Sequence, residues 1–203
     1  MNLIHRWLCR SGGWRKTVER DILPWVMNGV DLGPDVLEVG PGPGITTDLL
    51  RLRIDRLTGI EVDPALAKSL SARLQGANVD VLHGDATHMP FADARFSGAV
   101  CFTMLHHVPS PELQDRLLRE VQRVLKPGGC FVGVDSRQSL GMRLIHIYDT
   151  LVPIDPDGFA ARLEASGFID VQVESNPARF RFQARRPGAQ VSRSLQSPWR
   201  IPC

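Results

Sequence analysis

"VLEVGPGPG", residues 36–44, decides the fold of this chain, because it joins a short apolar strand to three alternate glycines. Glycine is needed where the backbone adopts a positive φ or must approach a ligand closely. "ITTDLLRLRI", residues 45–54, follows and begins a helix whose first N–H groups have no partner within the helix. The stretch therefore predicts a strand, a ligand-binding loop and a helix in succession.

Apolar runs alternate with helical segments along the rest of the chain. The expected strands are residues 35–40, 56–62, 79–84, 96–102, 130–135, 169–175 and 179–185. The expected helices are residues 45–54, 63–74, 110–125 and 159–168. Repeated strand–helix units with apolar strands imply an α/β fold, with a mostly parallel sheet covered by helices on both faces. The last two strands alternate in period 2 and can close the sheet as a hairpin-like pair.

Three regions are expected: an N-terminal helical cap at 1–30, a main domain at 31–186 and a loose tail at 187–203. Apolar residues of the cap recur near period 3.6, which favours an amphipathic helix pair packed on the domain. Two alternatives stay open for this cap, namely a lid over a ligand pocket and a basic helix that seeks a membrane surface.

Composition excludes several classes of protein. The chain has 203 residues, 43% of them hydrophobic and 23% charged, with a net charge of +2, which is too weak a bias to indicate nucleic-acid binding. No apolar run approaches the roughly 20 residues of a membrane span. The cysteines are scattered without a disulfide framework, and we expect a cytoplasmic protein.

Six histidines show no ligand spacing with cysteines or carboxylates, so we expect no metal site. His106 and His107 are adjacent, but we expect them at an extended strand end, where neighbouring side chains point apart.

Glu61 ends the second expected strand, where it can accept hydrogen bonds from ribose hydroxyls. A nicotinamide dinucleotide site would share this feature, but its fingerprint G-x-G-x-x-G is broken here by Ile45. Glu38 lies beside the loop, where a carboxylate repels a pyrophosphate and attracts an ammonium. We therefore expect a nucleoside with a positively charged amino-acid tail. An NAD-dependent oxidoreductase and a tight turn without a ligand are the less favoured readings.

With these residues the sequence resembles the class I S-adenosylmethionine-dependent methyltransferases, and more narrowly the branch of the ubiquinone and menaquinone biosynthesis methyltransferases. The resemblance spans residues 36–186 and rests on six motifs in order: "VLEVGPGPG", "GIEVDP", "GDATHMPF", "FSGAVCFTMLHHV", "REVQRVLKPGG" and "LEASGF". It implies a Rossmann-like sheet of seven strands in the order 3-2-1-4-5-7-6, with strand 7 antiparallel. It also implies S-adenosylmethionine as cofactor, with S-adenosylhomocysteine as product.

The resemblance also implies roles for single residues. Gly40, Gly42 and Gly44 would line the methionine and ribose portions of the cofactor. Glu38 would face the methionine amino group, and Glu61 would bind the ribose hydroxyls.

Further roles follow at the next two strand ends. Val62 would contact the adenine face, Asp85 would accept from the adenine amine, and the Ala86 N–H would donate to a ring nitrogen. Cys101 and Phe102 would provide backbone contacts near the methionine end.

Methyl transfer from a sulfonium mainly requires that the acceptor be held in line with the carbon–sulfur bond. We expect the acceptor to lie between the fourth strand end, the N-terminal helices and residues 136–157. The candidate acceptor-binding residues are Trp7, Trp14, His106, His146 and Tyr148. His106 is also the candidate for orienting or deprotonating the acceptor, whereas His107 is interpreted as a structural residue that holds the turn.

The expected partner is a small apolar molecule such as a phenol or quinol. A phospholipid head group, reached by peripheral membrane contact of the N-terminal helix, is the first alternative. The second alternative is that the protein binds the cofactor but catalyses no reaction.

Overall fold

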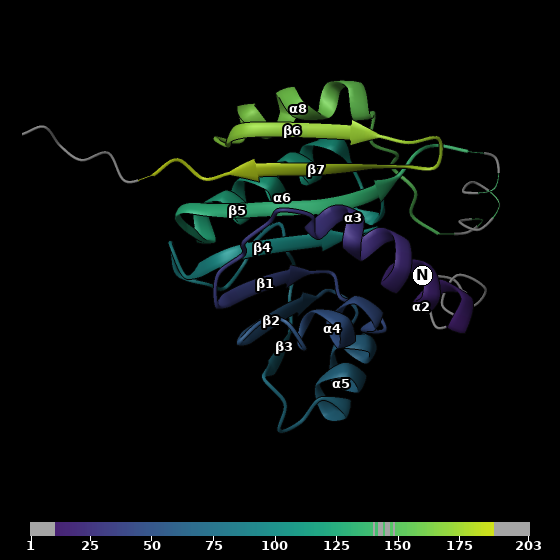
Figure 1. The fold of residues 1–203 in the computed structure, drawn as a ribbon, viewed down its shortest axis with the longest axis vertical. Coiled ribbons are helices and arrows are strands. Elements are labelled where there is room, and N and C mark those ends of the chain that lie inside the picture. Colours follow the sequence, from purple (N-terminus) through teal and green to yellow (C-terminus); the bar gives the residue numbers. More distant parts are fainter. Residues whose placement is uncertain (1–10, 140, 142–143, 145–146, 148, 189–203) are drawn as a thin grey trace, which may run out of the picture.

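The computed structural model describes residues 11–139, 141, 144, 147 and 149–188, and is built around one twisted sheet (Figure 1). Its strands are β1 (Asp35–Val39), β2 (Arg56–Glu61), β3 (Val79–His83), β4 (Phe96–Phe102), β5 (Leu125–Ser136), β6 (Ile169–Ser175) and β7 (Arg179–Arg185). They lie in the order β3-β2-β1-β4-β5-β7-β6. The first five are parallel, and β7 runs antiparallel to β5 and β6. The predicted seven-stranded order is therefore confirmed.

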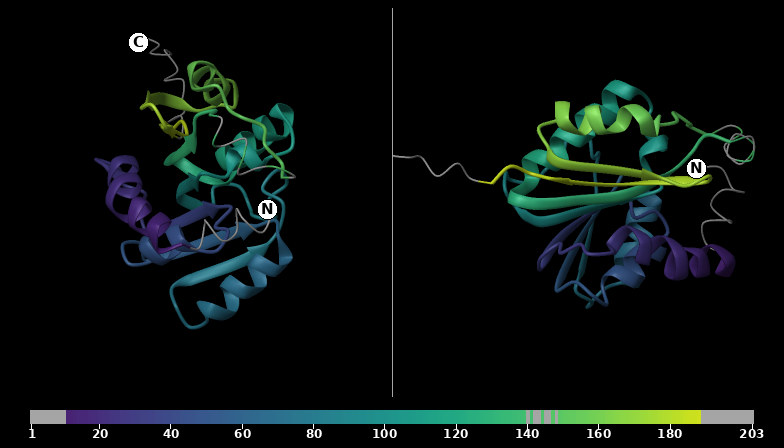
Figure 2. Two further views of the ribbon diagram at one scale, coloured as in Figure 1. Left: turned by 90° about the vertical axis from the view of Figure 1, so that its right-hand side faces the viewer. Right: turned by 45° about the horizontal axis from the view of Figure 1, so that its top comes forward.

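Helices occupy both faces of this sheet (Figure 2). They are α2 (Gly12–Thr17), the π-helix η1 (Val18–Ile22), α3 (Leu23–Met27), α4 (Ile45–Leu50), α5 (Pro64–Arg73), the short 3-10 helix η2 (Leu105–His107), α6 (Pro111–Val124) and α8 (Pro156–Ala165).

The predicted starts of two helices are confirmed by their caps. The Asp63 carboxylate accepts from the N–H groups of Ala65 and Leu66, at 2.9 and 3.1 Å, and so begins α5. Ser110 accepts from the Leu113 N–H at 3.3 Å and begins α6. Proline follows each cap, where its missing N–H costs no hydrogen bond.

The core has two layers, because successive residues of a strand point to opposite faces. Leu37 packs with α6 and α8, whereas its neighbour Val36 packs with the N-terminal helices, α4 and α5. Both residues are fully buried, as expected for a parallel strand covered on both sides.

Two local expectations are wrong. Residues 126–129 do not precede the fifth strand but belong to it, because Leu125 already pairs with Phe96 of β4 before an irregularity in the register. His106 and His107 do not lie at an extended strand end but in η2, with their ring centroids 4.2 Å apart. A tight helical turn brings adjacent side chains closer than a strand does.

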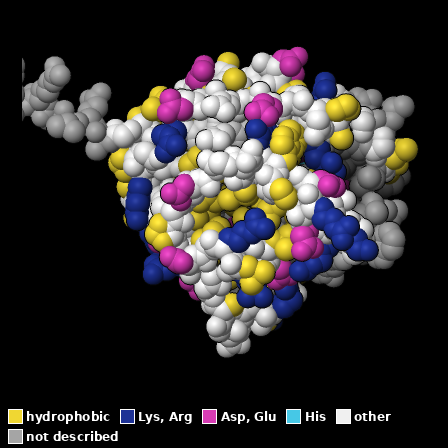
Figure 3. All heavy atoms as spheres, viewed as in Figure 1, with side chains coloured by type: hydrophobic (Ala, Val, Ile, Leu, Met, Phe, Trp, Pro, Cys, Tyr) yellow, Lys and Arg dark blue, Asp and Glu magenta, His cyan; other side chains and the backbone are white. Residues whose placement is uncertain are grey.

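On the face shown in Figure 3, Lys and Arg side chains are interspersed with Asp and Glu, so that face carries no field of one sign. Within the described part of the chain, no helix has both the length and the apolar composition needed to cross a membrane. The expected tail beyond residue 188, and Trp7, His146 and Tyr148, lie outside the described residues.

Candidate cofactor and acceptor site

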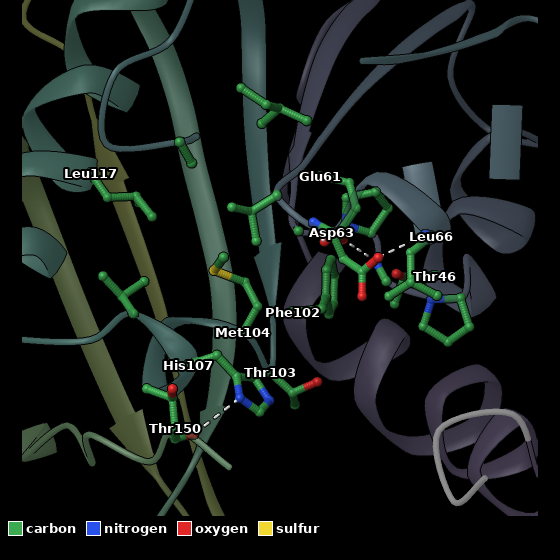
Figure 4. A pocket seen from close by; sticks show the side chains of 18 of the residues that line it. Thr46, Glu61, Asp63, Leu66, Phe102, Thr103, Met104, His107, Leu117 and Thr150 are labelled. Carbon is green, nitrogen blue, oxygen red and sulfur yellow. Dashed lines mark hydrogen bonds between the residues drawn. The ribbon is translucent and has the colours of Figure 1, made fainter. Parts of the chain in front are cut away.

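A cavity of about 410 Å³ opens at the carboxyl ends of β1, β2 and β4 (Figure 4). The chain reverses its strand order between β1 and β4, and ligands of open α/β sheets bind at such a point. The cavity is lined by residues from the N-terminal helices, the strand ends and the loops after them. They include Trp14, Val18, Ile22, Gly40, Gly42, Thr46, Glu61, Val62, Asp63, Asp85, Ala86, Thr87, Phe102, Thr103, Met104, His107, Asp149 and Thr150.

The glycine loop between β1 and α4 forms the floor of this cavity. Gly42 has a φ of +55°, and a Cβ added there would meet no atom within 4 Å. Its missing side chain therefore leaves room for a ligand beside the backbone. Gly44 has a φ of +86°, and a Cβ there would lie 2.3 Å from Leu70 Cδ1, so this glycine allows α4 to pack on α5 and does not line the cavity.

Glu61 is held rigidly at the end of β2. Its Oε2 atom accepts from the Gly42 N–H at 2.8 Å, and its Oε1 atom accepts from the Asp63 N–H at 2.9 Å (Figure 4). The residue is buried, with 6% of its surface exposed. A carboxylate has about four acceptor sites, so two remain for a pair of hydroxyl groups on a ligand.

The loop after β3 forms a second wall with Asp85, Ala86 and Thr87. Asp85 Oδ1 accepts from the Thr87 N–H at 2.8 Å, which fixes the carboxylate within its own turn. Val62 lies across from this loop at the cavity rim, with 65% of its surface exposed.

Helix α6 anchors the continuation of that loop. Glu120 accepts from the Met89 N–H at 2.7 Å, and Arg123 donates to the Met89 carbonyl at 3.0 Å. The hydrogen bond from Arg123 keeps the pKa of Glu120 below its usual range.

Glu38 lies beneath the glycine loop and is almost fully buried. Its carboxylate accepts from the hydroxyls of Thr46 and Thr47, at 2.5 and 2.7 Å. Burial raises the pKa of Glu38 to about 7, although the two hydroxyl groups oppose this shift. Thr46 lines the cavity and Glu38 does not, so the carboxylate stands one hydroxyl away from a bound ligand.

The charges of the cavity test which ligand fits. Its carboxylates are Glu61, Asp63, Asp85 and Asp149, and no Lys or Arg is among the described residues that line it. A pyrophosphate would meet only negative side chains here, which disfavours a dinucleotide. A nucleoside can donate hydrogen bonds from its hydroxyl groups to these carboxylates, and a cationic tail is attracted by their charge. The residues present therefore fit S-adenosylmethionine.

We expected His106 to face the acceptor and His107 to be structural, but in the structure His107 lines the cavity and His106 does not. His106 is 3% exposed, does not line the cavity, and has its Nδ1 atom 2.5 Å from Asp135 Oδ1. His107 does line the cavity, and its Nδ1 atom lies 3.2 Å from the carbonyl oxygen of Thr150 (Figure 4). His107 does hold the turn as well, since its N–H donates to the Met104 carbonyl at 2.9 Å.

The remaining expected residues divide between wall and core. Trp14, Gly40 and Phe102 line the cavity, whereas Cys101 is buried behind it. Burial raises the pKa of the Cys101 thiol well above its usual value.

Several wall residues were not expected from the sequence, and they are Val18, Ile22, Thr46, Thr87, Thr103, Met104, Asp149 and Thr150. Thr103 has a φ of +50°, which is unusual for a β-branched residue. Thr46 follows the glycine loop directly, and the N-terminal helices and residues 136–157 were expected beside the acceptor as regions, but the individual residues carried no signal of their own.

A seven-stranded sheet with β7 antiparallel, a glycine loop after β1 and acidic residues after β2 and β3 together define the class I methyltransferase fold. Residues 37–133, just under half of the chain, match the family model described as "Methyltransferase domain".

Two curated relatives match at modest identity. A probable S-adenosylmethionine-dependent methyltransferase of Mycolicibacterium smegmatis is 35% identical over 100 residues, which are 49% of this chain and 37% of the relative. A ubiquinone biosynthesis O-methyltransferase of Pseudomonas putida is 31% identical over 135 residues, 63% of this chain and 56% of the relative. The match thus spans about half the length of these relatives or less.

Solved structures have the same fold as this chain, and one example is a methyltransferase with its cofactor. A phosphoethanolamine N-methyltransferase 2 of Haemonchus contortus, in complex with S-adenosyl-L-methionine, has a TM-score of 0.72 at 16% identity. The similarity covers 91% of this chain and 56% of that chain.

Proposed function

We propose that this protein binds S-adenosylmethionine in the cavity and transfers its methyl group to a small acceptor that carries no negative charge. The observation that carries this proposal is the charge of the cavity lining, in which four carboxylates can accept hydrogen bonds and no Lys or Arg is among the described residues. The match of residues 37–133 to the methyltransferase domain supports the same reading.

The residues around the glycine loop hold the cofactor in this proposal. Glu61 accepts hydrogen bonds from the ribose hydroxyls, and Asp85 and the Ala86 N–H bind the adenine edge. Glu38 acts through the hydroxyl of Thr46 on the methionine amino group, because its carboxylate accepts from that hydroxyl. When bound, S-adenosylmethionine supplies a methyl group attached to a positively charged sulfur.

The reaction moves the methyl carbon to an oxygen, nitrogen or carbon of the acceptor. The carbon–sulfur bond breaks with its electron pair going to sulfur, and the acceptor loses a proton. The protein contributes mainly by holding the acceptor in line with that bond.

His107 is the residue proposed to orient the acceptor. A carbonyl oxygen only accepts, so the Thr150 carbonyl favours the tautomer of a neutral ring with its proton on Nδ1. The other ring nitrogen then carries a lone pair that can take a proton from a hydroxyl or an ammonium. Gln114 supports this geometry by donating to the carbonyls of Leu105 and Val152, at 3.1 and 2.9 Å.

A phosphate-bearing acceptor, such as a phospholipid head group, is the second candidate. The Haemonchus contortus enzyme with the same fold is named for phosphoethanolamine. Phosphates in proteins are usually bound by Arg, Lys or a helix N-terminus. The described lining of this cavity offers no Arg or Lys, so we favour the uncharged acceptor.

The test begins with calorimetric titration of S-adenosylmethionine, S-adenosylhomocysteine and NAD. We expect the first two to bind and NAD to fail; binding of NAD alone would overturn the proposal. Turnover is then measured as S-adenosylhomocysteine release on panels of phenols, quinols, amines and phosphoethanolamine. Cofactor binding with no turnover on any panel would instead favour a non-catalytic cofactor-binding protein.

A further inference from the structure

Elements α2, η1 and α3 follow one another without a break and form one N-terminal helix, Gly12–Met27. Its hydrogen-bond spacing changes where it lines the cavity. The Val18 N–H donates three and four residues back, to Arg15 and Trp14. The Leu23 N–H donates five residues back, to the carbonyl of Val18, so residues Val18–Ile22 form a turn of π-helix. Such turns are rare, and they occur frequently at functional sites.

This π turn aligns three cavity-lining side chains. Trp14, Val18 and Ile22 follow one another at intervals of four residues, and all three line the cavity. In a regular α-helix each such interval advances by about 40° around the axis, so the third residue would turn away from the first. A π turn is wider, so the interval from Val18 to Ile22 falls short of a full turn and cancels that advance.

Strand β7 fixes this helix on the sheet through two tryptophans. The Arg179 guanidinium lies over the Trp14 ring and the Arg181 guanidinium over the Trp25 ring, each at 5.6 Å from the ring centre. Arg181 also donates to the Trp25 carbonyl. Val18 and Ile22 are 1% and 2% exposed. The stripe of Trp14, Val18 and Ile22 therefore has two residues in the core, and the partly buried Trp14 packs against them.

We propose that this stripe, kept in line by the π turn, selects an uncharged acceptor with a flat apolar part, such as a fused aromatic ring bearing a hydroxyl. The inference rests on the proposed function, because it assumes that the cavity holds cofactor and acceptor together. Trp14 is partly exposed and offers a flat ring, and Val18 and Ile22 complete the same wall with little exposed surface of their own. The Arg179 guanidinium lies over the Trp14 ring but does not line the cavity.

The probe for this wall is 2-naphthol, titrated calorimetrically into protein saturated with S-adenosylhomocysteine. We expect 2-naphthol to bind, and Trp14→Ala to weaken it at least about tenfold. Trp25→Ala is the matched control, because Trp25 is on the same helix and under an arginine at the same 5.6 Å but does not line the cavity. It should change the affinity less than about twofold.

Three outcomes would overturn the inference. They are failure of 2-naphthol to bind the unaltered protein, equal affinity in Trp14→Ala, and binding of the anionic analogue 2-naphthoate as tightly as 2-naphthol. Binding of S-adenosylhomocysteine is measured first in every variant. If the unaltered protein does not bind it, the proposed function fails; if the protein binds it but one of the three outcomes above occurs, only the inference about the wall fails.

Discussion

The Nδ1 atom of His106 lies 2.5 Å from the Oδ1 atom of Asp135, and both side chains are buried between the ends of β4 and β5. The same carboxylate accepts from the backbone N–H groups of His106 and Ser136, at 3.2 and 2.6 Å. This pair fixes the point where η2 leaves the sheet. It therefore also fixes where the next residue, His107, meets the cavity.

Asp135→Ala should lower the free energy of unfolding by about 3 kcal/mol or more. The change removes the acceptor of the buried His106 ring and N–H and of the partly buried Ser136 N–H, and a buried donor without its acceptor costs about 1–3 kcal/mol. Urea denaturation measures the loss. Asp135→Asn is the control, because its amide oxygen can still accept and its size is unchanged, and it should lose less. An Asp135→Ala protein with the midpoint of the unaltered protein would contradict the structural role of the pair.

His107→Ala should lower kcat/KM for a hydroxyl-bearing acceptor by about 10²-fold, the lower end of what proton transfer by a side chain contributes. Cofactor affinity should stay unchanged, because none of the predicted cofactor contacts lies in η2. The measurement is steady-state turnover on the acceptor found in the panel, with calorimetry for the cofactor. His83→Ala, an exposed histidine at the end of β3, is the control. Full turnover in His107→Ala would reduce the residue to part of the cavity wall.

Glu38 should make stability fall as pH rises between about 4.5 and 7. Burial raises the pKa of this carboxyl from 4.5 to about 7, so the folded state binds more protons than the unfolded state in that interval. The contribution is complete below about pH 4.5 and is lost above about pH 7, which amounts to about 3 kcal/mol.

Glu38→Gln measures this effect, because glutamine does not titrate and the other carboxyl groups cancel in the comparison. The difference in unfolding free energy, measured in urea from pH 4 to pH 8, should shift by about 3 kcal/mol in favour of the variant as pH rises. A difference independent of pH would show that Glu38 keeps an ordinary pKa.

Glu61→Ala should weaken S-adenosylmethionine binding by about 1–3 kcal/mol, because ribose hydroxyls would lose their charged acceptor. The change also frees the Gly42 N–H, which donates to Glu61 at 2.8 Å. Calorimetric titration gives the affinity. Glu61→Gln keeps the size of the side chain and one acceptor oxygen, so its affinity should lie between those of the unaltered protein and Glu61→Ala. Equal affinity in Glu61→Ala would remove this residue from the site.

Local signals located the strands and helices, because apolar runs are bounded by caps such as Asp63 and Ser110. The order of the strands in the sheet came from the resemblance of the motifs to the class I methyltransferases, and the structure confirms it. The glycine loop, Glu61 and Asp85 were also readable, because parallel strands bring their carboxyl ends to one edge.

The acceptor side could not be read in the same way. Thr103, Ile22 and Thr150 lie in the three regions expected around the acceptor, but nothing in their own neighbourhoods marks them as individual wall residues. Nor does the sequence mark the π turn at Val18–Ile22, or the contact of Arg181 with the Trp25 carbonyl more than 150 positions away.

By itself, the sequence determined the class of fold and indicated that the glycine loop, Glu61 and Asp85 meet at one cavity, since these features depend on patterns that are local along the chain. Only the tertiary structure decided which histidine meets the cavity. Both lie in one short turn, and the turn is oriented by a carboxylate 29 residues away, on Asp135. A side chain's direction at such a place is set by packing and hydrogen bonds between strands, which adjacent residue types do not encode.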